Sequence, residues 1–187
     1  MIGLALLLAA ATTPAKPPVA PAATPADLQA LVECRKEVPD FYALEPLLGD
    51  PARIAALGWT PLPRVNPFMT EYRLPAPIEV FGSRTNHIAF AGSSIIAVLD
   101  LPDPRPLAHR LQLETGLDTP QKALFGKQLR VSEKHDPASG RTLYLAVILN
   151  VSNVDSHPGK TLAGCTYDLD TDEAPADPPP ATPATSG

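Results

Sequence analysis

The chain has 187 residues, 44% of them apolar, and carries a formal net charge of −5 at pH 7. This length and composition are typical of one domain with acidic and flexible segments attached. No run holds more than two adjacent Lys or Arg residues, so we do not expect a nucleic acid to be the partner.

Residues 1–11 have the features of a secretory signal peptide. The apolar run Ile2–Ala11 is too short for a membrane span, which takes about 20 residues, but it suits the apolar region of a signal peptide. Ala9 and Ala11 fit a small-x-small cleavage pattern, whereas no Lys or Arg precedes the run. We expect a periplasmic or extracellular protein that starts near Thr12 and has no stable membrane span. The alternative is an apolar, disordered leader.

Proline is concentrated near both ends of the chain. Five of the 24 prolines precede Leu28, and five follow Glu173. Segments of this kind bury too little apolar surface to offset the entropy lost on ordering them. We therefore predict a disordered leader at residues 12–24, a single domain at residues 25–170 and a disordered acidic, proline-rich tail at residues 171–187.

Three short helices are predicted where a capping residue precedes a proline: Thr24-Pro25, Asp50-Pro51 and Asp103-Pro104. The first helix has apolar residues at helical spacing and places Cys34 beside them. The second should end at Gly58, and the third should extend toward Gly116.

Seven segments rich in β-forming residues are separated by turn residues: 71–74, 77–82, 86–91, 93–101, 127–134, 141–151 and 160–169. Within them, Ile95–Leu101 and Leu143–Leu149 are almost continuously apolar, which predicts central strands covered on both faces. Two helices, four strands, one helix and three strands in this order favour an α+β domain. Its largely antiparallel sheet should have six to seven strands.

A weak internal repeat is a further hypothesis. Phe81-Gly82 and Phe125-Gly126 each precede a predicted hairpin whose second strand is very apolar. Each half of the domain would then begin with a Phe-Gly turn, the alternative being coincidence in a protein with many glycine turns.

Cys34 and Cys165 are the only cysteines, and they have no metal-ligand spacing. In an oxidising compartment such a pair forms a disulfide more often than it stays reduced. Strand alternation places Cys165 on the more apolar side of its strand, facing the layer where the first helix packs. We predict a Cys34–Cys165 disulfide, the alternative being two buried thiols in a cytosolic protein.

Two histidine-aspartate pairs, His135 with Asp136 and Asp155 with His157, contain the donor atoms of a divalent-metal site. If residues 141–150 form one strand, the two pairs lie at its opposite ends, about 30 Å apart at ~3.3 Å per residue. Each pair is then explained by turn formation. We therefore expect neither a metal site nor a bound cofactor.

Ser93 and Ser94 are the hydroxyl groups best placed for nucleophilic catalysis, and His87 precedes them closely. Ile96 stands where a nucleophile elbow would have its second glycine. A Gly-Ser-Ser turn between two strands explains both serines without a function. His87, Ser93 and Ser94 are therefore only weak candidates for a polar site.

No assembled catalytic set is visible in the sequence, so we expect a small exported, non-enzymatic domain that binds a protein or a cell-envelope component. Two alternatives come from other classes of protein. One is a hydrolase with a dispersed site, which a convergence of His87 with a serine and a carboxylate would favour. The other is a carrier of an apolar ligand, with the two apolar strands lining its cavity.

Overall fold

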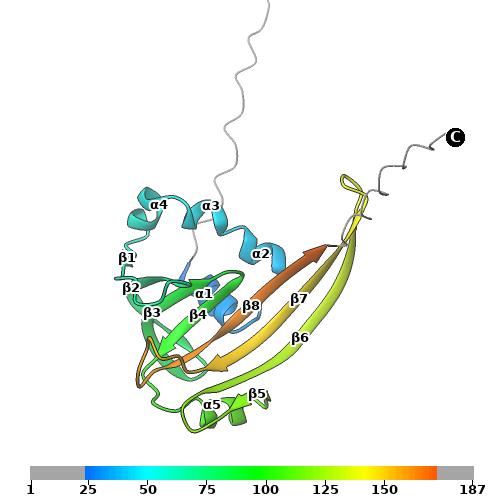
Figure 1. Ribbon diagram of the computed structural model, residues 1–187. Coiled ribbons are helices and arrows are strands. Elements are labelled where there is room, and N and C mark those ends of the chain that lie inside the picture. The colour runs from blue at the N-terminus through cyan, green and yellow to red at the C-terminus, as the bar shows by residue number, and fades with distance from the viewer. Residues whose placement is uncertain (1–23, 172–187) are drawn as a thin grey trace, which may run out of the picture.

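One antiparallel sheet runs through the computed structural model, which describes residues 24–171 (Figure 1). Its order is β1-β2-β3-β4-β8-β7-β6-β5. The strands are β1 (Thr60–Pro61), β2 (Thr70–Val80), β3 (Ser83–Ala91), β4 (Ser94–Leu99), β5 (Glu114–Asp118), β6 (Ala123–Asp136), β7 (Arg141–Ser152) and β8 (Thr161–Thr171). The helices in these residues are α1 (Pro25–Val32), α2 (Val38–Tyr42), α3 (Glu45–Leu48), α4 (Pro51–Ala56) and α5 (Arg105–Arg110). The predicted α+β class is confirmed, with eight strands instead of six to seven.

The predicted signal peptide lies outside the described residues. The predicted leader and tail lie outside them too, apart from Thr24 and Thr171 at the two ends of the described range.

At all three predicted helix starts, the predicted side chain accepts a hydrogen bond from a nearby backbone amide. Asp103 accepts from the amide of Arg105, the first residue of α5. The side chain of Thr24 accepts a hydrogen bond from the backbone amide of Asp27. The side chain of Asp50 accepts from the amides of Ala52 and Arg53. Both caps satisfy backbone donors that have no partner inside the helix, which explains where α1 and α4 begin.

The remaining helices differ from expectation. α5 ends at Arg110, and Gln112, with a φ of 55°, turns the chain away from the helix. Gly116, expected near the end of this helix, lies in β5 instead. The sequence did not indicate α2 and α3, because helices of five and four residues are too short for an apolar period to appear.

Strand β2 joins two segments that the sequence separates. Its pairing with β3 changes register between Arg73 and Ile78. Pro75 and Pro77 lie in this interval and cannot donate hydrogen bonds to the ladder, which accounts for the irregularity. β5 was not predicted, because all five of its residues are exposed and it has no apolar pattern.

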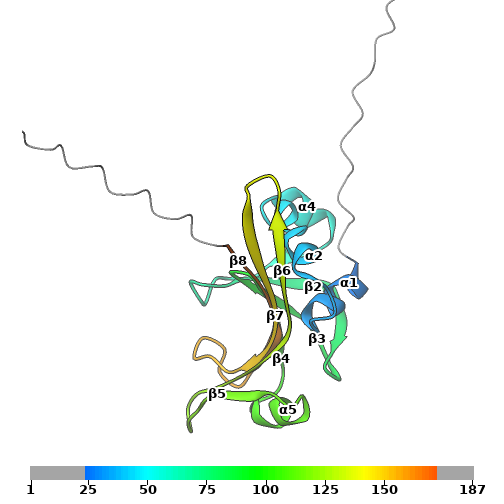
Figure 2. The same cartoon turned by 90° about the vertical axis from the view of Figure 1, so that its right-hand side faces the viewer.

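α1 and α2 cover one face of the sheet, which we call the inner face, and the β7–β8 loop lies on the opposite, outer face (Figure 2). The ring of Phe41 in α2 stacks on that of Tyr167 in β8, with ring centroids 5.2 Å apart. The Tyr167 hydroxyl donates a hydrogen bond of 2.8 Å to the carbonyl of Leu31 in α1. Burial raises the pKa of this phenol, so it stays protonated and remains a donor. β8 therefore anchors both helices to the sheet.

The two very apolar segments lie in β4 and β7, away from the sheet edges as predicted. Strand β4 is mostly buried. In β7, however, buried residues alternate with partly exposed ones, and Tyr144 is 41% exposed. The prediction that β7 is covered on both faces is wrong, because α2 packs on its inner face and its outer face stays partly open.

The two Phe-Gly pairs do not occupy equivalent positions. Phe81 and Gly82 form a turn between β2 and β3, with φ values of 51° and 73°. Phe125-Gly126 lies inside β6, where both residues pair with β7. The proposed repeat is therefore wrong in its register. The sheet nevertheless consists of two four-stranded meanders, β1–β4 and β5–β8, which meet where β4 pairs with β8.

The predicted disulfide joins Cys34 to Cys165. Their Cα atoms are 5.2 Å apart, inside the usual range of about 4.4–6.8 Å. Cys34 was expected within the first helix but lies two residues beyond its end, with a φ of 55°. The amide of Arg35 donates back to the carbonyl of Ala30 and closes the helix terminus. The disulfide thus fixes the C-terminal end of α1 to β8.

Replacing Cys34 or Cys165 by serine should lower the free energy of unfolding by about 2–5 kcal/mol, because the crosslink no longer restricts the unfolded chain. The double variant should lose about as much as either single variant, since the same bond is lost in all three. Urea unfolding followed by circular dichroism measures the loss, with reduced wild-type protein as the control. A double variant that lost the sum of the two single effects would contradict a shared bond.

Candidate functional site

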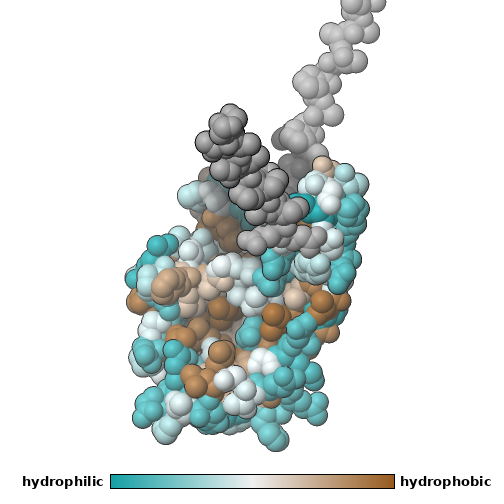
Figure 3. Space-filling model, turned by 45° about the vertical axis from the view of Figure 1, so that its right-hand side comes forward, coloured by the Kyte–Doolittle hydropathy of each residue, from teal (hydrophilic) through white to brown (hydrophobic). Residues whose placement is uncertain are grey.

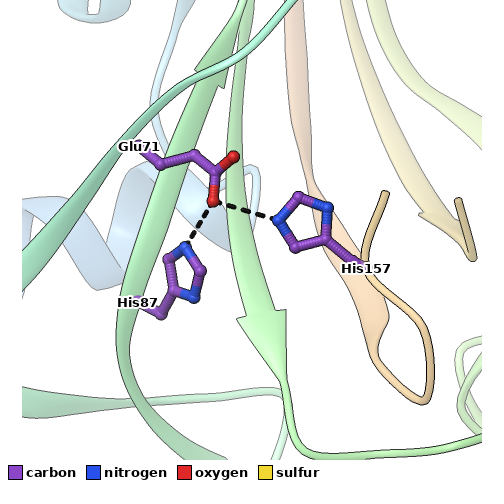
Figure 4. A group of neighbouring side chains, drawn as sticks. All are labelled: Glu71, His87 and His157. Carbon is purple, nitrogen blue, oxygen red and sulfur yellow. Dashed lines mark hydrogen bonds and ion pairs between the residues drawn. The ribbon is translucent and has the colours of Figure 1, made fainter. Parts of the chain in front are cut away.

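Three polar side chains converge on the outer face of the sheet (Figure 4). Glu71 belongs to β2 and lies opposite Ala89 of β3 in the ladder. His87 precedes Ala89 by two residues and therefore projects from the same face. His157 comes from the β7–β8 loop, residues 153–160, which crosses this face. We call these three residues the His-Glu cluster.

Both imidazoles contact the same carboxylate oxygen. Nε2 of His87 lies 2.7 Å from Oε2 of Glu71, and Nε2 of His157 lies 3.0 Å from that oxygen. The three potential ligand atoms all lie within 4.8 Å of one another. The two imidazoles thus face one carboxylate from two different parts of the chain.

The cluster is largely shielded from solvent. The side chains of Glu71 and His157 are 2% and 6% exposed, and that of His87 is 27% exposed. A small group of buried apolar residues lies on the same outer face: Met69, Ala89, Val98 and Leu162, with Val154 packed against them. Charged and polar groups in such surroundings need partners, because burial removes their hydration.

A short hydrogen-bond chain positions His157. The backbone amide of Phe68 donates to Oδ1 of Asn66, which leaves the Asn66 Nδ2 group to donate to Ser156 Oγ at 3.1 Å. Ser156 Oγ lies 3.0 Å from Nδ1 of His157. The hydroxyl can donate to Nδ1, or it can accept from it when Nδ1 carries the proton. Either way, the chain holds the imidazole with Nε2 toward Glu71.

The carboxylate of Glu71 is only half satisfied. Its Oε2 atom has two imidazole partners, whereas Oε1 is buried without a hydrogen-bond partner among the described residues. Leaving a buried acceptor without a partner costs about 1–3 kcal/mol. The Oε1 atom of Glu71 could therefore accept a further hydrogen bond or coordinate an ion at a buried position.

The exposed side of His87 faces a pocket of about 300 Å³. The pocket is lined by residues of β2, β3 and β4, by the residue that follows β4 and by the residue that precedes β8: Arg73, Pro77, Arg84, Thr85, Asn86, His87, Val98, Asp100 and Lys160. A ligand in this pocket would reach the cluster from the side of His87.

Two imidazole nitrogens and one carboxylate form a donor set suited to a divalent transition metal ion. Zn–N and Zn–O bonds of about 2.0–2.2 Å place tetrahedral ligand atoms about 3.3–3.6 Å apart. The Nε2–Oε2 separations of 2.7 and 3.0 Å would have to widen by less than about 1 Å. Three protein ligands would leave one coordination position free.

The sequence pointed to only part of this cluster. His87 was a weak candidate, and His157 had been grouped with His135, Asp136 and Asp155. The structure separates these groups as expected, since Asp136 caps the β6–β7 hairpin at the other end of β7 from His157. Glu71 was missed, because a single charge in a strand carries no motif. The one feature of the sequence that could have indicated Glu71 is its acidic side chain in a segment predicted to be a strand.

Ser93 and Ser94 lie away from His87. Ile88 pairs with Ala97 in the β3–β4 ladder, so His87 lies level with Val98. Ser94 is four residues from Val98, about 13 Å along the strand. The Ser94 hydroxyl contacts that of Thr166 at 2.7 Å. The convergence of serine, histidine and carboxylate that would have favoured a serine hydrolase is therefore not formed by these residues.

Comparisons with known proteins yielded no relative for this chain. No protein-family model matches it, and searches of curated proteins and of solved structures returned no significant similarity. The function must therefore be argued from the site itself.

Replacing Asn66 by alanine should lower the free energy of unfolding by about 0.5–1.5 kcal/mol, because Ser156 loses a donor and the amide of Phe68 loses an acceptor. Asn66→Asp retains the acceptor for Phe68 and should lose less. Urea unfolding of both variants provides the measurement. Equal losses in the two variants would contradict the assignment of separate roles to the two ends of the amide.

Proposed function

We propose that the protein is a small exported domain that binds one divalent transition metal ion, with zinc as the model case, at Glu71, His87 and His157. The observation that carries this proposal is the convergence of two Nε2 atoms on a buried carboxylate whose Oε1 atom has no hydrogen-bond partner within residues 24–171. A metal ion requires ligand atoms from several side chains that point toward one shielded position.

The hydrogen-bond chain behind His157 supports this assignment. In the tautomer of His157 that carries its proton on Nε2, this proton points at Glu71 and Ser156 donates to Nδ1. If a metal ion were bound to Nε2, Nδ1 would carry the proton and would donate to Ser156 Oγ. Histidine ligands of metal ions usually have such a partner on their second nitrogen. Ser156, held by Asn66, can therefore contact Nδ1 of His157 with or without a bound ion.

Export is the second part of the proposal. The Cys34–Cys165 disulfide supports it, since disulfides persist mainly in oxidising compartments. Residues 1–11 supply the signal-peptide pattern. None of the helices within residues 24–171 has the length and apolar character that crossing a membrane would require.

The expectation of a protein or cell-envelope partner also stays a prediction. The strands β6 and β7 carry large apolar side chains that are substantially exposed: Leu124, Leu129, Val131 and Tyr144. Figure 3, which brings the β6 side of the molecule forward, shows apolar residues interspersed with hydrophilic ones on this face. These exposed apolar side chains support the proposal that a partner binds at β6 and β7, away from the residues of the His-Glu cluster.

Metal binding predicts one Zn²⁺ ion per chain by isothermal titration calorimetry. Glu71→Gln, which preserves side-chain shape, and His157→Ala should each weaken binding roughly 100-fold or more, because each removes a ligand from the buried set. His109→Ala and His135→Ala serve as controls, since both histidines are exposed and lie outside the cluster.

The same ion should stabilise the folded protein by about 2.7 kcal/mol at a free concentration 100 times the dissociation constant. A thermal melt with and without Zn²⁺ measures this effect. Binding that survives Glu71→Gln but disappears in the His135→Ala control would contradict the assigned site.

Export predicts that the mature protein starts near Thr12, because Ala9 and Ala11 mark the cleavage pattern. Amino-terminal sequencing of protein recovered from the periplasm or the medium of an expressing bacterial host tests this. Full-length protein that remains in the cytosol would argue against export.

A further inference from the structure

The pocket beside the His-Glu cluster has the charge and position of an anion-binding site. We propose that Arg73 and Arg84 hold the carboxylate or phosphate group of a small anionic ligand, and that this group completes the coordination of the metal ion. The inference rests on the proposed metal site and adds the chemical class of its ligand.

Strand pairing places one arginine directly beside the cluster. Arg73 lies opposite His87 in the β2–β3 ladder. Residues opposite each other in an antiparallel pair have Cβ atoms about 4.5–5.5 Å apart and project from the same face. Arg73 therefore borders the exposed side of the His87 imidazole, where the pocket opens.

The irregular stretch of the sheet adds the second arginine. Tyr72 and Val80 of β2 belong to the main core and therefore point to the inner face. Their partners in β3, Ile88 and Ser83, share this face. The Glu79–Arg84 pair alternates with Val80–Ser83 and therefore faces outward, as Arg73–His87 does. The change of register at the two prolines of β2 thus allows Arg84 and His87, three residues apart, to line one pocket.

The guanidinium groups of Arg73 and Arg84 are available to bind a ligand. In the described part of the chain, neither Arg73 nor Arg84 forms an ion pair with a carboxylate, although Glu79 lies opposite Arg84. The other charges of the pocket compensate each other, since Lys160 is paired with Asp100. Guanidinium groups bind carboxylate and phosphate oxygens through paired hydrogen bonds, so the excess positive charge fits an oxyanion.

The geometry also limits the size of the ligand. A volume of about 300 Å³ is at the lower end of the range for ligand pockets. Two imidazoles and one carboxylate leave a fourth position on a tetrahedral metal ion. An oxyanion between the arginines and His87 would occupy that position. It would then be bound by the guanidinium groups and by the metal ion at the same time.

The test uses the full mature protein loaded with Co²⁺, whose visible absorption changes when a new ligand enters its coordination shell. Titration with acetate and, separately, with inorganic phosphate should give saturable spectral changes. The two dissociation constants show whether a carboxylate or a phosphate is preferred. In the Arg73→Gln/Arg84→Gln double variant, both constants should rise at least tenfold while the affinity for Co²⁺ stays within threefold of wild type.

Arg53→Gln is the matched control, because Arg53 lies in α4 outside the pocket, and it should change neither affinity. Anion binding of unchanged strength in the double variant would overturn the role of the arginines and leave the metal site intact. Anion binding without a change in the Co²⁺ spectrum would overturn the shared coordination. Failure of the wild-type protein to bind Co²⁺ would overturn the metal site and this inference together.

Discussion

The pairing of β4 with β8 is the contact on which the rest of the fold depends. Each meander has its own hairpins, and among the described strands only this pairing unites them into one sheet. Gly164 allows it, because a Cβ atom at this position would collide with the backbone of Ile95 and Ile96. A residue with a side chain would force the strands apart, so the absence of a side chain here is a requirement of close packing.

The same strand organises both faces of the sheet. On the inner face, β8 carries Cys165 and Tyr167, which attach α1 through a disulfide and a hydrogen bond. The loop that precedes β8 crosses the outer face and supplies His157. Helix attachment and site formation are therefore coupled through one strand. A change that displaces β8 would disturb the core and the His-Glu cluster together.

The His-Glu cluster is unfavourable for the stability of the fold, but its donor atoms are arranged to bind an ion. The buried Glu71 carboxylate contacts two imidazoles, and one of its oxygens has no hydrogen-bond partner in the part of the chain that the structure describes, so it is not an efficient core contact. Apolar side chains of similar size would pack there without that cost. The bracing of His157 through Asn66 and Ser156 keeps the donor atoms in place. This arrangement is what preorganised binding requires, since the ligand atoms need little movement when an ion enters.

By itself, the sequence determined the local features of this protein. Capping residues placed the starts of α1 and α4, alternation predicted which side of β8 carries Cys165, and two cysteines allowed one intramolecular pairing. Only the tertiary structure decided the site. Alternation shows the face to which Glu71 or His87 belongs, but it does not show which strand lies beside it or which loop covers it. His157, 86 residues from Glu71, reaches that carboxylate because long-range pairing of β4 with β8 brings its loop over the β2–β3 hairpin.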